Sequence, residues 1–175
     1  MSDPRYPVGP LVPRTSLNHD ERNAMLDEIA ATPQRLRDAV AGLDDAQLDT
    51  PYRDGGWSLR QVVHHVPDSH LNAYTRLKLA LTEDNPIIRP YDEALWAKLP
   101  DAQDTPIETS LTLLESLHAR WVGLFRSLQP EDFARTFRHP EHSGVQTIDW
   151  LVAMYSWHGR HHVAHITSAR ERLGW

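Results

Sequence analysis

The sequence predicts an all-α protein, a four-helix bundle with a proline-rich N-terminal arm. Apolar residues recur at helical spacing in four long segments, which bury a common core when helices pack side by side. No segment combines alternating apolar and polar residues with β-branched enrichment, so we expect no sheet. A chain of 175 residues is long enough for one core. We therefore expect one domain over residues 1–175, with an extended arm at residues 1–14, where four prolines disfavour regular structure.

The first two expected helices each contain a proline. Around residues 16–42, apolar positions at helical spacing predict the first helix. Pro33 predicts a kink there, because proline lacks a backbone donor and clashes with the preceding turn. Ser58 is the expected N-cap of the second helix, whose apolar stripe ends at Leu81. Pro67 lies inside that helix and predicts a bend.

The third helix has a start signal of its own. Thr105 is the expected N-cap, Pro106 the first helical residue, and Glu108 follows three residues after the cap. The apolar face of this helix runs to Leu128. Residues 84–105 before it hold three prolines and are expected to form a long connection, a kind of segment that often carries function.

The fourth helix is expected to open at Thr147 or Gln146. It continues to about Arg172, and Gly174 is the natural stop because glycine adopts the left-handed cap conformation without steric cost. This helix contains the segment WHGRHHVAHI.

Composition excludes several classes of function. The net charge of −6, with 18 basic and 24 acidic residues, gives no basic surface for nucleic acid or for an anionic membrane, so we expect a small-molecule substrate. The chain has no cysteine, which excludes disulfides, thiolate zinc sites and a protein thiol nucleophile. No signal-peptide pattern is present, and no apolar run approaches the roughly 18–20 residues of a membrane span. We expect a cytoplasmic protein.

Histidines are concentrated in two segments. Seven of the eleven lie there: His64, His65, His70, His158, His161, His162 and His165. The last four form two i, i+4 pairs, which a helix places on one face. Neutral imidazole is a common ligand of transition metals, and a third histidine from the first segment would complete a three-histidine site with an open position.

Helical periodicity ranks these histidines without settling the set. On the fourth helix, His158 and His162 lie more centrally on the apolar face than the other pair. On the second helix, the apolar stripe favours His70, with His65 at its edge and His64 nearly opposite. A lone histidine on an apolar face is more often a hydrogen-bonded core residue than a ligand, so burial without metal is the alternative.

Two motifs resemble a known family. The segments GGWSLRQVVHHVPDSH and WHGRHHVAHI are similar to the two motifs of the DinB-like superfamily, specifically its YfiT subgroup. The stretches YPVGP, DTPYRDGGW, IRPYDEALW and the closing GW are similar to the same subgroup, so the resemblance extends over essentially the whole chain.

The resemblance implies a fold, a site and an activity. It implies a homodimeric four-helix bundle that holds a divalent metal ion, zinc or nickel, through His65, His158 and His162, with water in the open position. Pro67 departs from the family, which usually has a helix former there. The implied activity is that of a metal-dependent hydrolase. The alternatives are a bacillithiol-type S-transferase, whose nucleophile is a low-molecular-weight thiol, and a metal-binding module without turnover.

Further residues have weaker expectations. Asp68 could orient an imidazole or remain a solvated carboxylate. The connection offers possible pocket residues, which are Arg89, Tyr91, Asp92 and Glu93. Two tryptophans beside the ligand segments either floor a pocket or belong to the core: Trp57 and Trp157. Four histidines receive no role: His19, His118, His139 and His142.

Overall fold

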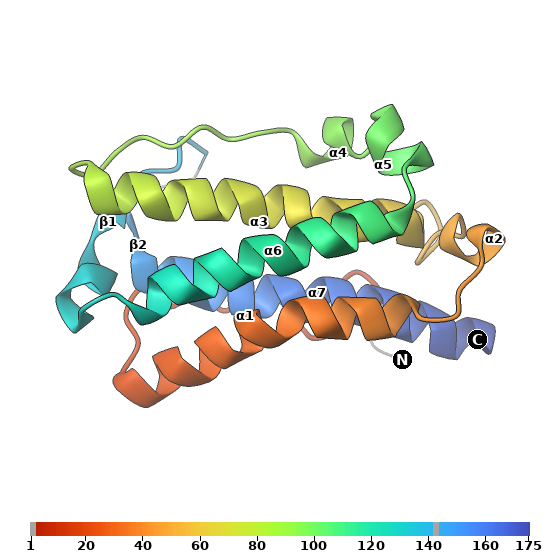
Figure 1. Cartoon of the computed structure of the whole chain (residues 1–175), viewed down its shortest axis with the longest axis horizontal. Coiled ribbons are helices and arrows are strands. Elements are labelled where there is room, and N and C mark those ends of the chain that lie inside the picture. The colour runs from red at the N-terminus through yellow and green to blue at the C-terminus, as the bar shows by residue number, and fades with distance from the viewer. Residues whose placement is uncertain (1–2, 142–143) are drawn as a thin grey trace.

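Four long helices form a bundle in the computed structural model, which describes residues 3–141 and 144–175 (Figure 1). They are α1 (His19–Val40), α3 (Leu59–Thr82), α6 (Ile107–Arg126) and α7 (Ile148–Leu173). The predicted fold class is therefore confirmed. None of the described helices is both long enough and apolar enough to cross a membrane.

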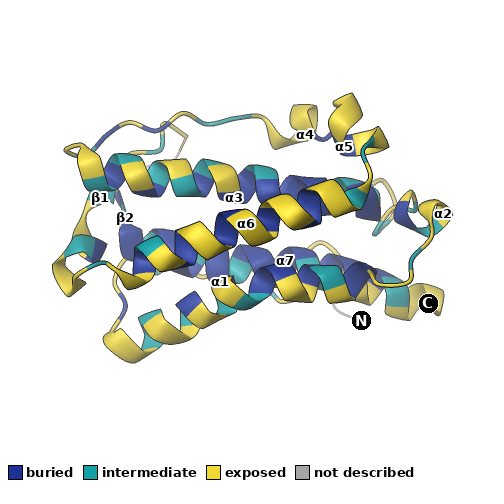
Figure 2. Ribbon diagram, in the orientation of Figure 1, coloured by how far each residue is buried: buried dark blue, intermediate teal, exposed yellow. Residues whose placement is uncertain are grey.

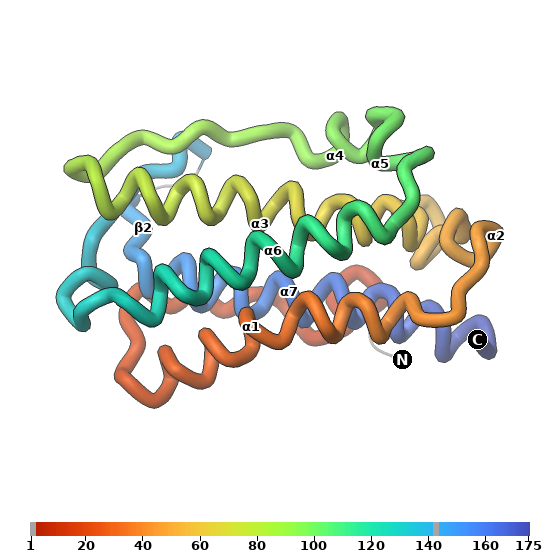
Figure 3. Tube along the Cα trace, in the orientation of Figure 1, coloured from red at the N-terminus to blue at the C-terminus, as the bar shows by residue number. Residues whose placement is uncertain are grey.

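The topology of the bundle brings the last long helix against the first. Helix α1 packs against α6 and α7, and α3 packs against the same two helices. Helices α1 and α7 run in one direction, and α3 and α6 run in the other (Figure 1). Because α3 and α6 are parallel, residues 83–106 must return along the length of the bundle, and the trace in Figure 3 shows this connection outside α3. This connection becomes one wall of the site described below.

The helix ends follow local capping chemistry. The Ser58 side chain accepts a hydrogen bond from the backbone N–H of Gln61, whose own side chain accepts from the Ser58 N–H. The Thr147 side chain accepts from the backbone N–H of Trp150. Gly174, with φ of 74°, forms the left-handed cap that ends α7. The expected start of the second helix, and Thr147 and Gly174 at the ends of the fourth, are confirmed.

The expected start of the third helix is wrong by one residue. Pro106 is the N-cap of α6, and no side chain caps that end. Thr105 instead ends the short helix α5 (Pro100–Asp104), and its carbonyl accepts a hydrogen bond from the Nε2 of His64. The backbone of Thr105 therefore serves a tertiary contact rather than the start of α6.

Several short elements are not predicted by the sequence. The connection contains α4 (Glu93–Trp96) as well as α5, while α2 (Asp45–Leu48) and the 3-10 helix η1 (Pro130–Ala134) lie in other loops. The expectation of no sheet is also wrong in detail, because β1 (Thr136–Phe137) pairs antiparallel with β2 (Gln146–Thr147). Two-residue strands and helices of one turn are too short to produce a periodic pattern.

The two helical prolines are both buried inside continuous helices, Pro33 in α1 and Pro67 in α3. The N-terminal arm contains no helix or strand from residue 3 to residue 14, as expected. It is held against α7 by a hydrogen bond of 3.0 Å from the Trp157 Nε1 to the Gly9 carbonyl.

The buried core consists of two apolar clusters with a band of histidines between them. Along α7, Leu151 and Tyr155 belong to one cluster and Ile166 to the other. His158 and His162 lie between these residues in the sequence and are buried with them. Figure 2 shows the buried residues of the long helices in dark blue. The fold thus places polar rings in the middle of the bundle, where water is largely excluded.

Candidate metal centre

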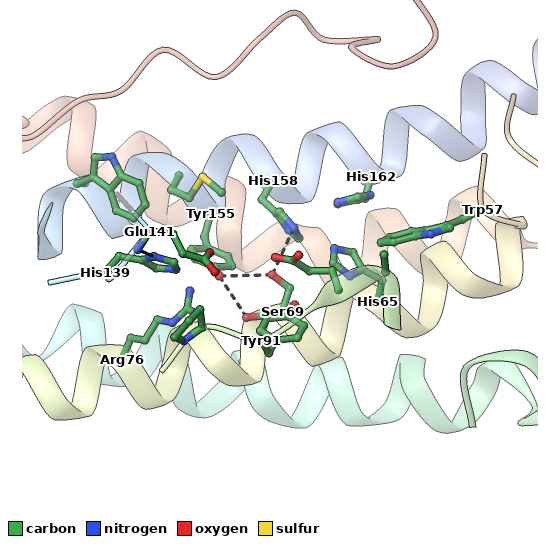
Figure 4. Close-up of a pocket in the computed structure, with 15 residues that line it drawn as sticks. Trp57, His65, Ser69, Arg76, Tyr91, His139, Glu141, Tyr155, His158 and His162 are labelled. Atoms are coloured by element: carbon green, nitrogen blue, oxygen red, sulfur yellow. Dashed lines mark hydrogen bonds between the residues drawn. The ribbon is translucent and has the colours of Figure 1, made fainter. Parts of the chain in front are cut away.

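Three imidazoles from two helices converge in the histidine band. His65 comes from α3, and His158 and His162 come from consecutive turns of α7 (Figure 4). One ring nitrogen from each lies within 4.8 Å of the corresponding nitrogens of the other two. All three side chains are buried. This is the set implied by the resemblance, and its role as a ligand set stays a prediction.

The spacing fits a divalent transition metal. Three points that lie within 4.8 Å of one another share a centre no more than about 2.8 Å from each of them, and Zn–N bonds are about 2.0–2.1 Å long. Small side-chain adjustments therefore suffice to bring all three nitrogens to bonding distance.

The charge state of the three imidazole rings also fits coordination of a metal ion. Burial, reinforced by neighbouring His161 and His165, lowers the pKa of His65 to about 4. Burial holds the pKa values of His158 and His162 well below the ordinary value. The three imidazoles are therefore neutral at pH 7, and the neutral ring is the form that offers a lone pair to a metal.

The hydrogen bonds leave ring nitrogens available. The Nδ1 of His158 lies 3.0 Å from the Nε2 of His70, so the nitrogen of His158 that remains for the group is Nε2, which also lies 3.3 Å from the Ser69 Oγ. Within the described residues, the buried Nδ1 of His162 has no hydrogen-bond partner. Burying a polar atom without a partner costs free energy, and no described protein group offsets that cost at this nitrogen of His162.

A cavity of about 370 Å³ opens beside the three imidazoles. Figure 4 shows Ser69, Tyr91 and Tyr155 beside the histidines and Arg76 farther along α3. The wall of the cavity also includes two carboxylates, an imidazole and apolar groups: Glu93, Glu141, His139, Trp57, Trp150 and Met154. An ion held by the histidines would face this space, which is large enough for a small molecule.

Two neutral phenols lie at the centre of the cavity wall. Burial raises the pKa values of Tyr91 and Tyr155 above the ordinary value, so both hydroxyls keep their protons at neutral pH. The Tyr155 hydroxyl donates to the Ser69 carbonyl at 3.2 Å, and the Ser69 Oγ lies 3.3 Å from the Nε2 of His158. These contacts link the wall of the cavity to one of the three imidazoles.

The candidate pocket residues of the connection have different positions. Tyr91 and Glu93 line the cavity, as expected of pocket residues. The Asp92 side chain instead accepts a hydrogen bond from the Leu95 N–H and caps α4. Arg89 is exposed and does not line the cavity.

Asp68 is not bonded to an imidazole. It forms no side-chain hydrogen bond among residues 3–141 and 144–175, and it is half-buried. Burial, reinforced by Asp101, raises its pKa to about 6. The expectation that it could orient an imidazole finds no contact in the described structure.

The other histidines near the site are outside the ligand group. His70, which the apolar stripe favours, is fully buried, and both of its ring nitrogens contact other histidines. His64 is bonded to Ser110 and Thr105. His161 and His165 line a separate cavity of about 440 Å³ on the other side of His162.

The four histidines without an expected role have different surroundings. His118 contacts His70 in the core, and His139 lines the cavity. His19 is exposed and contacts Asn23, while His142 lies outside the described residues.

The two tryptophans beside the ligand segments also have different surroundings. Trp57 lines the cavity and packs against His65 with 4.8 Å between ring centroids. Trp157 stacks on His161 with 4.2 Å between ring centroids, and it does not line the cavity beside the three imidazoles.

Sequence reasoning missed several residues of the wall. Ser69 and Tyr155 could have been found, since Ser69 lies four residues after His65 and Tyr155 three residues before His158, positions that share a helix face. Arg76, Glu141 and His139 gave no such signal, because they reach the cavity from distant turns and loops.

Comparison with known proteins identifies relatives along the whole chain. A sequence model described as the DinB superfamily matches residues 28–166. Two relatives bear the name "Putative metal-dependent hydrolase": one from Bacillus cereus (strain 03BB102) is 52% identical, and one from Bacillus anthracis (strain CDC 684 / NRRL 3495) is 51% identical. Both alignments cover 175 residues and all of each chain.

A solved structure matches as well. It is described as YfiT from Bacillus subtilis, "a probable metal-dependent hydrolase with an unusual four-helix bundle topology". The two structures superpose with a TM-score of 0.96 at 45% sequence identity, and the match covers 98% of each chain.

Proposed function

The chain belongs to the DinB superfamily, as its motifs predict, and we propose that it is a metal-dependent hydrolase whose ion is held by His65, His158 and His162. The convergence of the three ring nitrogens within 4.8 Å carries this proposal. The names of the relatives and the cavity beside the imidazoles support it.

We propose zinc or nickel as the ion, because imidazole nitrogen suits both metals. A divalent ion held by these three imidazoles would supply Lewis acidity and would lower the pKa of a coordinated water toward neutrality. The rest of the chemistry belongs to residues of the cavity.

Phenol, guanidinium and carboxylate side chains of the cavity have distinct tasks in this proposal. Tyr91 and Tyr155 are neutral phenols, and the Tyr91 hydroxyl can donate a hydrogen bond to a substrate oxygen. Arg76 lines the cavity, and its buried Nε has no hydrogen-bond partner within the described part of the chain, so its guanidinium can orient a polar or anionic substrate group. Glu93 is the carboxylate that we assign to accept a proton from the attacking nucleophile.

A pair of measurements tests the proposal. Protein purified without chelators is analysed for metal, and the loaded protein is then assayed with ester and amide substrates, each with and without a low-molecular-weight thiol. The hydrolase proposal predicts turnover without thiol. Turnover only with thiol would assign the chain to the S-transferase alternative, and bound metal without any turnover would favour a metal-binding module.

A further inference from the structure

Three histidines form a continuous hydrogen-bonded chain that reaches across the bundle to the candidate metal centre. The His118 Nδ1 lies 2.8 Å from the Ile29 carbonyl oxygen, and the His118 Nε2 lies 2.7 Å from the His70 Nδ1. The His70 Nε2 in turn lies 3.0 Å from the His158 Nδ1. All three rings are at least nine-tenths buried, so water does not take part in these bonds.

The far end of the chain fixes the position of every proton along it. A carbonyl oxygen only accepts, so the His118 Nδ1 must carry the proton that bonds to Ile29. A neutral imidazole has one N–H, so the His118 Nε2 is an acceptor and the His70 Nδ1 donates to it. By the same rule the His70 Nε2 accepts, and the His158 Nδ1 donates.

The Ile29 carbonyl is available because of a helical proline. In α1 its partner would be the backbone N–H of the residue four positions later, which is Pro33, and proline has no N–H. A buried carbonyl without a partner is costly, and the His118 N–H supplies the missing bond. Pro33 therefore leaves the Ile29 carbonyl free, and His118 occupies it.

The direction of the chain requires neutral rings. A second proton on His118 would let its Nε2 donate and would reverse every bond toward His158. His118 is only 3% exposed, and burial lowers its pKa to about 4, so the ring is neutral at pH 7.

We propose that His118 and His70 are positioning residues that hold the proton of His158 on Nδ1 and so leave Nε2 as the nitrogen with the free lone pair. That nitrogen faces His65, His162 and the Ser69 Oγ, which lies 3.3 Å away. The use of the lone pair for an ion rests on the proposed function, whereas the proton positions do not.

The first experiment reads the proton positions in the wild-type, metal-free protein. A long-range ¹H–¹⁵N correlation spectrum at pH 7, with ¹⁵N-labelled histidine, identifies the protonated nitrogen of each ring. The proposal predicts the Nδ1–H form for His118, His70 and His158. An Nε2–H form of His158 would overturn it. Since no metal is added, a failure of the proposed function does not affect this result.

The second experiment measures the effect of breaking the chain. His118→Leu removes the acceptor of the His70 proton, so that His70 is no longer held as the acceptor of the His158 N–H. Loss of a hydrogen bond made directly to a ligand typically lowers metal affinity about 10–100-fold, and we expect a loss toward the lower end of that range for this indirect change. Ser110→Ala is the matched control, because it removes a 2.7 Å hydrogen bond to the buried His64 between the same two helices. Zinc affinity is measured by competition with a chromogenic chelator.

The expected result is a loss of affinity in His118→Leu alone, together with the appearance of an Nε2–H form of His158. Equal affinity in wild type and His118→Leu, or an equal loss in Ser110→Ala, would overturn the positioning role. If His118→Leu does not fold, the wild-type spectrum decides the question.

Discussion

Gly159 allows α7 to approach α1 beside the candidate metal centre, and its replacement by alanine is expected to separate the two helices. A Cβ at this position would lie 2.4 Å from the Thr32 Oγ1 and 2.9 Å from the Thr32 Cγ2. Both distances are shorter than van der Waals contact. Overpacking of this kind costs about 1–3 kcal/mol of stability. Because three atoms of Thr32 lie close to the added Cβ, we expect a cost at the upper end of this range.

The net effect is smaller than the clash, because alanine favours a helix over glycine by about 1 kcal/mol. We therefore expect Gly159→Ala to lower the free energy of unfolding by about 2 kcal/mol, which corresponds to a fall in Tm of about 4–8 °C for a chain of this size. Urea denaturation at pH 7 and a thermal scan measure both quantities.

Two further variants distinguish this effect from a general effect of substitution. Gly123 lies in α6, and a Cβ added there would meet no other described atom within 4 Å, so Gly123→Ala should stabilise the protein. Thr32→Ala removes the two closest atoms and should restore much of the stability lost in Gly159→Ala. A Gly159→Ala variant as stable as wild type, or no recovery on adding Thr32→Ala, would refute the close packing of the two helices as the cause.

Four other predictions concern the site. His158→Ala and His162→Ala should each abolish stoichiometric metal while circular dichroism shows largely unchanged helix, whereas the control His161→Ala should keep the metal. Removal of the metal should lower thermal stability, since an ion that binds only the folded state contributes about 2.7 kcal/mol at 100 times its Kd. Burial lowers the pKa of His118 from 6.5 to about 4, so the unfolded state of the metal-free protein binds more protons between these values. The stability that neutral His118 contributes is complete above pH 6.5 and is lost toward pH 4, by up to about 3 kcal/mol. The urea midpoint should therefore fall less between pH 7 and pH 5 in His118→Leu than in wild type. Glu93→Gln should lower kcat in the hydrolase assay without changing metal content.

Each of these has a contradicting outcome. Full metal content in both alanine variants of α7 would reject the ligand set, and an unchanged melting curve after verified metal removal would show that folding does not depend on the ion. Equal pH dependence in wild type and His118→Leu would contradict the burial of a neutral ring. Unaltered turnover in Glu93→Gln would remove that carboxylate from the proposed chemistry.

The long helices could be predicted because their signals are local. Ser58, Thr147 and Gly174 act within one turn of the chain, and each has the capping role expected of it. Thr105 does not cap α6, whose N-cap is Pro106, and its carbonyl instead accepts a hydrogen bond from His64, 41 residues away in sequence. The short helices of the connection escaped prediction since one turn carries too few residues for a periodic signal.

The site could be predicted in part. On α7 periodicity favours His158 and His162, whose ring nitrogens converge with that of His65, although all four histidines of this helix are buried. On α3 it favours His70 over His65. His70 is the more buried of the two, whereas His65, at the edge of the apolar stripe, lines the cavity and has a ring nitrogen close to those of His158 and His162. Only the resemblance to the family selects His65.

The links between helices could not be predicted. His118 has no partner pattern in the sequence, and Pro33 predicts only a kink, because periodicity describes one helix at a time. Their relation depends on contacts between Ile29 of α1, His118 of α6 and His70 of α3, which only the packed bundle brings together.

The most direct test of the central claim is the metal content of folded protein after loading with excess zinc and removal of unbound ion. We expect one tightly bound ion per chain in wild type and in His161→Ala, and none in His162→Ala. A folded wild-type chain that retains no ion, or a His162→Ala variant that retains as much as wild type, would contradict the proposed metal centre.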